Sequence, residues 1–67
     1  MIELTVNGEV RHADPGATVA WLLDQMELTG KRLAVERNGD IVPKSLHATT
    51  ALHAGDKIEI VVAVGGG

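Results

Sequence analysis

Two Asn-Gly dipeptides, Asn7-Gly8 and Asn38-Gly39, constrain the fold of this chain more than any other feature of its sequence. A two-residue type I′ turn needs positive φ angles at both central positions, and Asn followed by Gly meets that need best. Each dipeptide lies between short runs that contain Ile, Leu or Val. The sequence therefore predicts two tight β-hairpins in different parts of the chain.

The residues around the first dipeptide support this prediction. Apolar and polar residues alternate over positions 2–6, which is typical of a strand with one buried face. Positions 9–13 are expected to return antiparallel to it, with Val10 pointing into the core. Pro15 cannot donate a hydrogen bond to a sheet, so the returning strand should end before it.

Between the two dipeptides the apolar spacing changes to that of a helix. Apolar residues stand at positions i, i+3, i+4 and i+7, which place them on one helix face. They are Val19, Leu22, Leu23 and Met26. Thr18 is the expected N-cap, and Gly30 is placed for a left-handed C′ position, so we expect a helix over about 19–28.

The second half of the chain predicts a shorter hairpin and a final strand. Residues 31–37, with Leu33 and Val35 in alternation, and residues 41–43 flank the second dipeptide, whereas residues 44–54 have no clean period. Alternation returns in the last strand at Ile58, Ile60, Val62 and Val64. The predicted core is Val6, Leu22, Leu23, Met26, Leu33, Ile58, Ile60 and Val62.

This order of elements favours an α+β fold with a mixed sheet. A helix between two hairpins can cover only one face of the sheet, and the last strand can then lie parallel to the first. That arrangement is the ubiquitin-like β-grasp. The competing ferredoxin-like fold needs a second long helix, which residues 45–52 do not supply. We expect one domain over 1–64 and a glycine tail over 65–67.

Composition excludes several classes of protein. A chain of 67 residues has room for one small domain, and it contains no Cys for disulfides or thiolate metal sites. The net charge of -3 argues against binding to a nucleic-acid backbone. Without a basic leader or a long apolar run, we expect a cytoplasmic protein with no membrane partner.

Side chains that could perform catalysis or bind metal are sparse. No two of His12, His47 and His53 have the i, i+4 spacing of a helical metal site, and Ser45 stands in no nucleophile motif. We therefore expect no catalytic residue, no metal and no cofactor bound by the chain itself. Four carboxylates are expected to be solvated and to serve solubility. They are Glu3, Glu9, Asp56 and Glu59.

The C-terminal Gly65, Gly66 and Gly67 are the one feature that suggests chemistry. Three residues without Cβ atoms can pass through a slot too narrow for other residues, and they end in a carboxylate. Such an end suits a partner enzyme that activates carboxylates with ATP. The alternative is an ordinary frayed terminus.

Five segments together resemble the ThiS family of sulfur carriers, and the resemblance runs over essentially the whole chain. They are Asn7-Gly8, 18–23 (TVAWLL), 34–43 (AVERNGDIVP), 55–60 (GDKIEI) and 64–67 (VGGG). The resemblance implies a carrier that is not itself an enzyme and acts in thiamine biosynthesis. Its carboxylate at Gly67, presented by Gly65 and Gly66, would be adenylated with ATP and converted to a thiocarboxylate.

The same resemblance implies three partners: an E1-like adenylating enzyme, a sulfur-donating desulfurase system and thiazole synthase. Three alternatives stay open at this point. The chain could be a carrier of the molybdopterin synthase small-subunit type, a β-grasp interaction module, or a tag that is joined to lysines.

Apolar residues near the tail suggest where partners dock. Val61 and Ala63 should lie on the sheet face away from the helix, where polar residues are usual, directly before Val64 and the glycines. Trp21 should be partly exposed on the helix, opposite the apolar stripe. We expect these four residues to bind partners. The alternatives are β-propensity for the strand residues and packing on its own surface for Trp21.

Overall fold

A computed structural model describes residues 1–63 and confirms the mixed sheet with one helix. The strands are β1 (Ile2–Val6), β2 (Glu9–Ala13), β3 (Leu33–Arg37), β4 (Asp40–Val42) and β5 (Lys57–Val62). The helix α1 spans Val19–Gln25, and a short 3₁₀ helix, η1, spans Lys44–Leu46. The strand order is β2-β1-β5-β3-β4, with β1 and β5 parallel and every other pair antiparallel.

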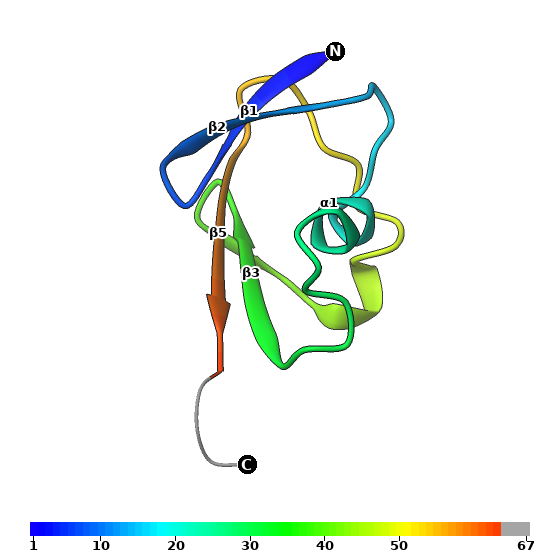
Figure 1. Ribbon diagram of the computed structural model, residues 1–67, viewed down its shortest axis with the longest axis vertical. Coiled ribbons are helices and arrows are strands. Elements are labelled where there is room, and N and C mark those ends of the chain that lie inside the picture. The colour runs from blue at the N-terminus through cyan, green and yellow to red at the C-terminus, as the bar shows by residue number, and fades with distance from the viewer. Residues whose placement is uncertain (64–67) are drawn as a thin grey trace.

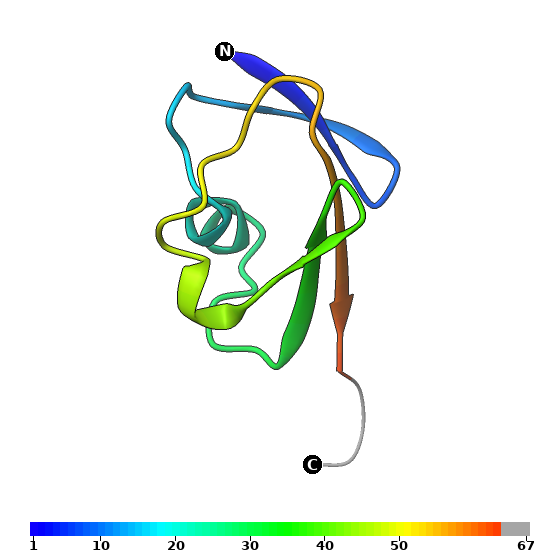
Figure 2. The ribbon, with the colours of Figure 1, turned by 180° about the vertical axis from the view of Figure 1, so that it is seen from behind.

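The molecule has two layers (Figure 1). The helix α1 and the η1 segment lie on one side of the sheet, and the view from behind shows the same separation (Figure 2). The apolar core fills the space between the layers. It consists of Leu4, Val6, Ala13, Val19, Leu22, Leu23, Val35, Val42, Leu52, Ile58 and Ile60. Three members of the predicted core, Met26, Leu33 and Val62, pack against it while only partly buried.

Both predicted hairpins are confirmed, but the prediction for Val10 is wrong. The two-residue turn pairs Val6 with Glu9, so the next pair is Thr5 with Val10. Paired residues share a face, and Thr5 lies on the face away from the core. Val10 is therefore exposed, and Ala13, which pairs with Ile2, is the buried residue of β2.

The helix begins as predicted and ends earlier than predicted. The Thr18 side chain accepts a hydrogen bond from the Trp21 backbone N–H, at 3.2 Å between N and Oγ1. At the other end the left-handed C′ position falls at Glu27, with φ of 59°, whereas Gly30, also left-handed with φ of 85°, lies three residues further along. The Leu28 N–H then bonds the Leu23 carbonyl at 2.8 Å, which is the Schellman pattern.

Residues 44–54 lack a period because they serve the start of the helix. The carbonyl oxygens of His47 and Thr50 accept hydrogen bonds from the Ala20 and Val19 N–H groups, at 2.8 and 3.0 Å. These donors have no partner within the helix itself. The segment also places Leu52 in the core with 2% exposure, a position that the sequence pattern did not indicate.

Candidate functional site

The outer face of the sheet, opposite α1, carries an apolar patch at the C-terminal end of β5. Val61 is 67% exposed, and Ala63 is exposed just beyond the strand. Ala34 of β3 pairs with Val61 and is exposed on the same face. We call Ala34, Val61 and Ala63 the terminal patch. It is the last surface that the structure describes before the chain end.

An acidic pair lies beside the terminal patch. Glu36 of β3 is paired directly with Glu59 of β5, and Ile41 of β4 is paired with Glu36. Like charges in directly opposed positions destabilise a sheet, so this pair does not stabilise the fold. Ile41 is 62% exposed. The outer face thus offers apolar contacts next to two carboxylates, which suits a partner surface that is apolar and basic.

The end of β5 is held in position on both sides. Pairing with β1 reaches only Ile58, but the Asn7 side chain continues it: Oδ1 accepts from the Ile60 N–H at 2.8 Å and Nδ2 donates to the Ile60 carbonyl at 3.2 Å. On the other side, the Ala63 N–H donates to the Arg32 carbonyl at 2.8 Å. These bonds make the terminal patch part of the sheet.

The start of β5 is fixed by Asp56, which is buried at 5% exposure rather than solvated as expected. Oδ2 accepts from Arg37 Nε and from the His53 N–H, both at 2.8 Å, and Oδ1 accepts from Asn38 Nδ2 at 3.0 Å. Burial by itself would raise the pKa of Asp56. The hydrogen bonds, of which those from Arg37 have the largest effect, and the positive charge of Arg37 outweigh burial and lower the pKa of Asp56. The carboxylate is therefore a structural ion.

The other predicted site residues lie elsewhere. Trp21 is half-buried on α1 and packs against the core, so the structure separates it from Val61 on the opposite face of the sheet. Val64, Gly65, Gly66 and Gly67 lie outside the described residues.

The described residues contain no cluster typical of a metalloenzyme. Within positions 1–63, no three His, Cys, Asp or Glu side chains lie close enough together to hold a metal ion. Over the same positions, neither helix has the length and apolar character that crossing a membrane requires.

Sequence reasoning found two members of the terminal patch and missed its neighbours. Alternation in the last strand was enough to place Val61 and Ala63 on the outer face. The contributions of Ala34 and Glu36 depend on the register between β3 and β5, which are separated in the sequence by β4, η1 and the loop that follows it. The Asn38-Gly39 turn alone would have shown that Ile41 lies opposite Glu36, since a two-residue turn sets that register.

This chain is similar in sequence to several known proteins. It is 46% identical over 66 residues to a thiazole synthase of Paramagnetospirillum magneticum, a match that covers 98% of this chain. The chain spans only 20% of that protein's length. It is also 32% identical to an uncharacterized protein, ycf40, of Porphyra purpurea, with 98% of this chain and 93% of that protein covered.

A solved structure and a family model agree with these relatives. The crystal structure of the thiamine biosynthesis protein ThiS from Geobacter metallireducens superposes with a TM-score of 0.81 at 29% identity. That match covers 98% of this chain and 100% of the other. The model of the ThiS family matches residues 4–67. The β-grasp prediction is thereby confirmed, and the chain belongs to the ThiS family.

Proposed function

We propose that this chain is a sulfur carrier of thiamine biosynthesis and that Gly67 is its acyl carrier. The observation that carries the proposal is the family match, which extends from residue 4 through the terminal glycines to Gly67. The chain acts as a protein cosubstrate in the cytoplasm rather than as an enzyme. Its β-grasp domain over 1–64 is the part that partner enzymes bind, and 65–67 is the segment that enters their active sites.

The proposed chemistry takes place on the terminal carboxylate. One carboxylate oxygen attacks the α-phosphorus of ATP, a P–O bond forms, and pyrophosphate leaves. A sulfide-level sulfur from the donor system then attacks the acyl carbon, and AMP leaves with the C–O electron pair. The product is a thiocarboxylate at Gly67. ATP belongs to the activating enzyme, so the carrier itself binds no cofactor.

Thiazole synthase is the proposed acceptor of the sulfur. Nearly all of this chain aligns with one fifth of a protein named thiazole synthase. A carrier and the enzyme that it supplies gain effective concentration when they are parts of one chain, which gives this similarity a functional reason. The terminal patch and the acidic pair would guide the separate carrier to the same enzyme.

The test is mass spectrometry of the intact chain after incubation with ATP, the E1-like activating enzyme and a sulfur donor. We expect one oxygen at Gly67 to be replaced by sulfur. Deleting Gly66 and Gly67 withdraws the carboxylate by up to about 7 Å of extended chain, so it should abolish both this product and ATP-to-pyrophosphate exchange. An unmodified carboxylate, with an enzyme proven active on another carrier, would contradict the proposal.

Docking is tested by a matched pair of charge insertions on the outer face. Val61→Asp places a carboxylate in the terminal patch, where partner binding would desolvate it, and should weaken binding to the activating enzyme or thiazole synthase. Val10→Asp makes the same change at another exposed valine, 58% exposed on β2 at the sheet edge. Equal affinities for the two variants would remove the terminal patch from the proposal.

A further inference from the structure

A pocket of about 370 Å³ lies on the helix side of the sheet, the opposite side from the terminal patch. Its apolar lining includes Leu23 at the end of α1, Leu28 in the following loop and Leu33 at the start of β3. The volume is within the range of sites that enclose a small ligand or a large side chain. An apolar lining of this kind favours an apolar group as occupant.

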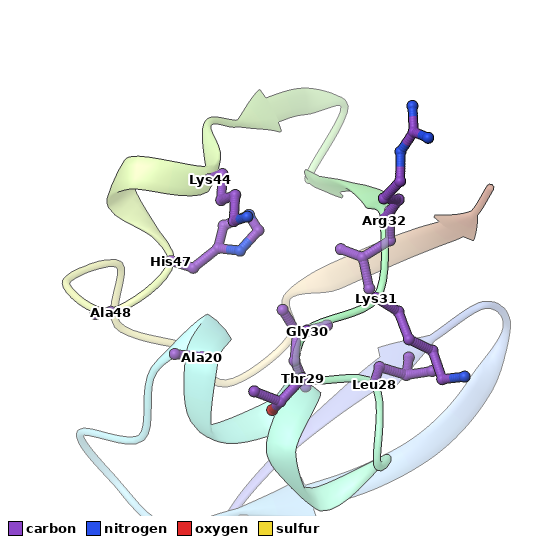
Figure 3. Close-up of a pocket in the computed structure, with 11 residues that line it drawn as sticks. Ala20, Leu28, Thr29, Gly30, Lys31, Arg32, Lys44, His47 and Ala48 are labelled. Atoms are coloured by element: carbon purple, nitrogen blue, oxygen red, sulfur yellow. The ribbon is translucent and has the colours of Figure 1, made fainter. Parts of the chain in front are cut away.

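The rim of the pocket is basic although the protein is acidic. Lys31, Arg32 and Lys44 all line it, and they are three of the six Lys and Arg residues of a chain whose net charge is -3. No Asp or Glu is among the described residues that line it. Figure 3 shows Lys44 and His47 on one side of the pocket and Lys31 and Arg32 on the other. Positive charge thus borders the apolar lining from η1 and from the loop before β3, with the charged ends of Lys31 and Arg32 turned outward at the rim.

The cations of this rim form no ion pair with the part of the chain that the structure describes. Within residues 1–63 the ion pairs are Glu3 with His12 and Arg37 with Asp56, and neither involves a rim residue. By contrast, His47 is engaged, because its Nε2 lies 3.1 Å from the Val42 carbonyl and donates to it. We therefore assign the rim charge to the two lysines and Arg32.

The pocket lies at the end of the molecule where β5 ends. The backbone carbonyl of Arg32, a rim residue, accepts a hydrogen bond from the Ala63 N–H at 2.8 Å. In Figure 1 the loop before β3 and the end of β5 lie side by side at this end of the sheet. A protein that receives the chain terminus can therefore reach the pocket at the same time.

From these observations we propose that the pocket binds an acidic segment of a partner protein. One large apolar side chain of that segment would enter the pocket, and carboxylates on either side of it in the segment would face the rim. The apolar lining would bury the inserted side chain, and the basic rim would pair with the flanking carboxylates. The role of this partner as receiver of the chain terminus rests on the proposed function. The chemistry of the pocket does not.

The pocket chemistry is tested by NMR titration of the full chain with a short acidic peptide, acetyl-Glu-Asp-Leu-Glu-Asp-amide. We expect amide shifts over residues 28–33 and 44–48, and weaker binding of matched peptides with Ala for Leu or Gln for Glu. Equal shifts with inorganic phosphate would assign the pocket to small anions and overturn the proposal. Shifts confined to the outer sheet face, or no shifts at all, would also overturn it.

The role in partner binding is tested with two variants and a control. Lys44→Glu reverses a rim charge, and Ala48→Phe fills the pocket from an exposed lining residue without changing charge. Each should weaken binding to the activating enzyme or thiazole synthase about tenfold. Arg11→Glu makes the same charge change on β2, away from the pocket, and should leave affinity within about twofold.

Two outcomes separate this inference from the proposed function. Affinity for both enzymes unchanged in Lys44→Glu and Ala48→Phe would overturn the pocket inference, even if the thiocarboxylate forms at Gly67. Peptide binding in the pocket of a chain that forms no thiocarboxylate would support the pocket and contradict sulfur transfer. A melting curve of each variant that matches the wild type verifies that the fold is intact.

Discussion

The two Asn-Gly turns have similar backbone conformations, and both form hydrogen bonds with the last strand, β5. Asn7 and Asn38 have φ angles of 51° and 53°. The Asn7 N–H donates to the Ile58 carbonyl at 2.9 Å, and the Asn38 N–H donates to the Lys57 carbonyl at 2.8 Å. Each side-chain Oδ1 also accepts from a β5 N–H at 2.8 Å. The strand β5 is thus held from both edges by turns that lie far apart in the sequence.

The turns differ in what the remaining amide group binds. Asn38 Nδ2 donates to the buried, ionised Asp56, whereas Asn7 Nδ2 donates to the neutral carbonyl of Ile60. Hydrogen bonds to charged groups contribute about twice as much stability as neutral ones. The second turn should therefore matter more for folding, and the first should mainly hold the end of β5 beneath the terminal patch.

The largest effect is expected where the second turn meets its charge. Asp56→Ala leaves Arg37 and two other donors without their acceptor, and should lower the free energy of unfolding by about 2–4 kcal/mol. Urea unfolding measures this loss. Asp24→Ala, at an exposed carboxylate on α1, should change stability by no more than about 0.5 kcal/mol. Comparable losses in both variants would show that Asp56 has no special role.

Acid should remove part of the same stabilisation. The hydrogen bonds that lower the pKa of Asp56 outweigh its burial, so the folded protein binds its proton less readily than the unfolded chain does. The ionic contribution is fully present above the ordinary carboxyl pKa of about 4 and is lost as pH falls through the lower folded pKa. Between pH 6 and acid conditions, the wild type should lose more stability than Asp56→Asn. Parallel curves would contradict this assignment.

Removing the Asn38 side chain should have the next largest effect. Asn38→Gly keeps a residue that accepts positive φ but deletes the bonds to Asp56 and Lys57, so we expect a loss of about 1–3 kcal/mol. Chemical denaturation at neutral pH measures it. In an Asp56→Ala background the substitution should cost clearly less, because the two residues share a hydrogen bond. Additive losses would argue that they act separately.

The turn backbones should respond equally, which provides the control for the comparison. Gly8 and Gly39 have φ angles of 82° and 89°, and an added Cβ would meet no atom within 4 Å at either position. Gly8→Ala and Gly39→Ala should therefore each cost about 1 kcal/mol from backbone conformation alone. Clearly unequal thermal unfolding of the two variants would mean that the turns differ in more than their asparagine side chains.

The smallest loss of stability is expected for Asn7→Gly. It removes two bonds to the Ile60 backbone, neither of them to a charge, and should cost about 1 kcal/mol or less. Its signature should instead be local, with faster amide hydrogen exchange at Ile60. A loss of stability equal to that of Asn38→Gly would abolish the distinction between the two turns.

The sequence by itself determined the elements whose causes are local. The Asn-Gly dipeptides, the two-residue alternation and the Thr18 cap act within a few residues, so both hairpins, the helix start and the outward position of Val61 could be predicted. The exposed position of Val10, for which the prediction was wrong, could also have been predicted, because the turn length pairs Val10 with Thr5.

The tertiary structure decided what depends on residues far apart in the chain. Asp56 is buried because donors from three other residues converge on it, and the pocket exists because the loop before β3 meets η1. The acidic pair and the place of Ala34 in the terminal patch depend on the register between β3 and β5. The spacing of apolar residues in the sequence does not reveal these contacts, since they form only when the sheet and helix pack together.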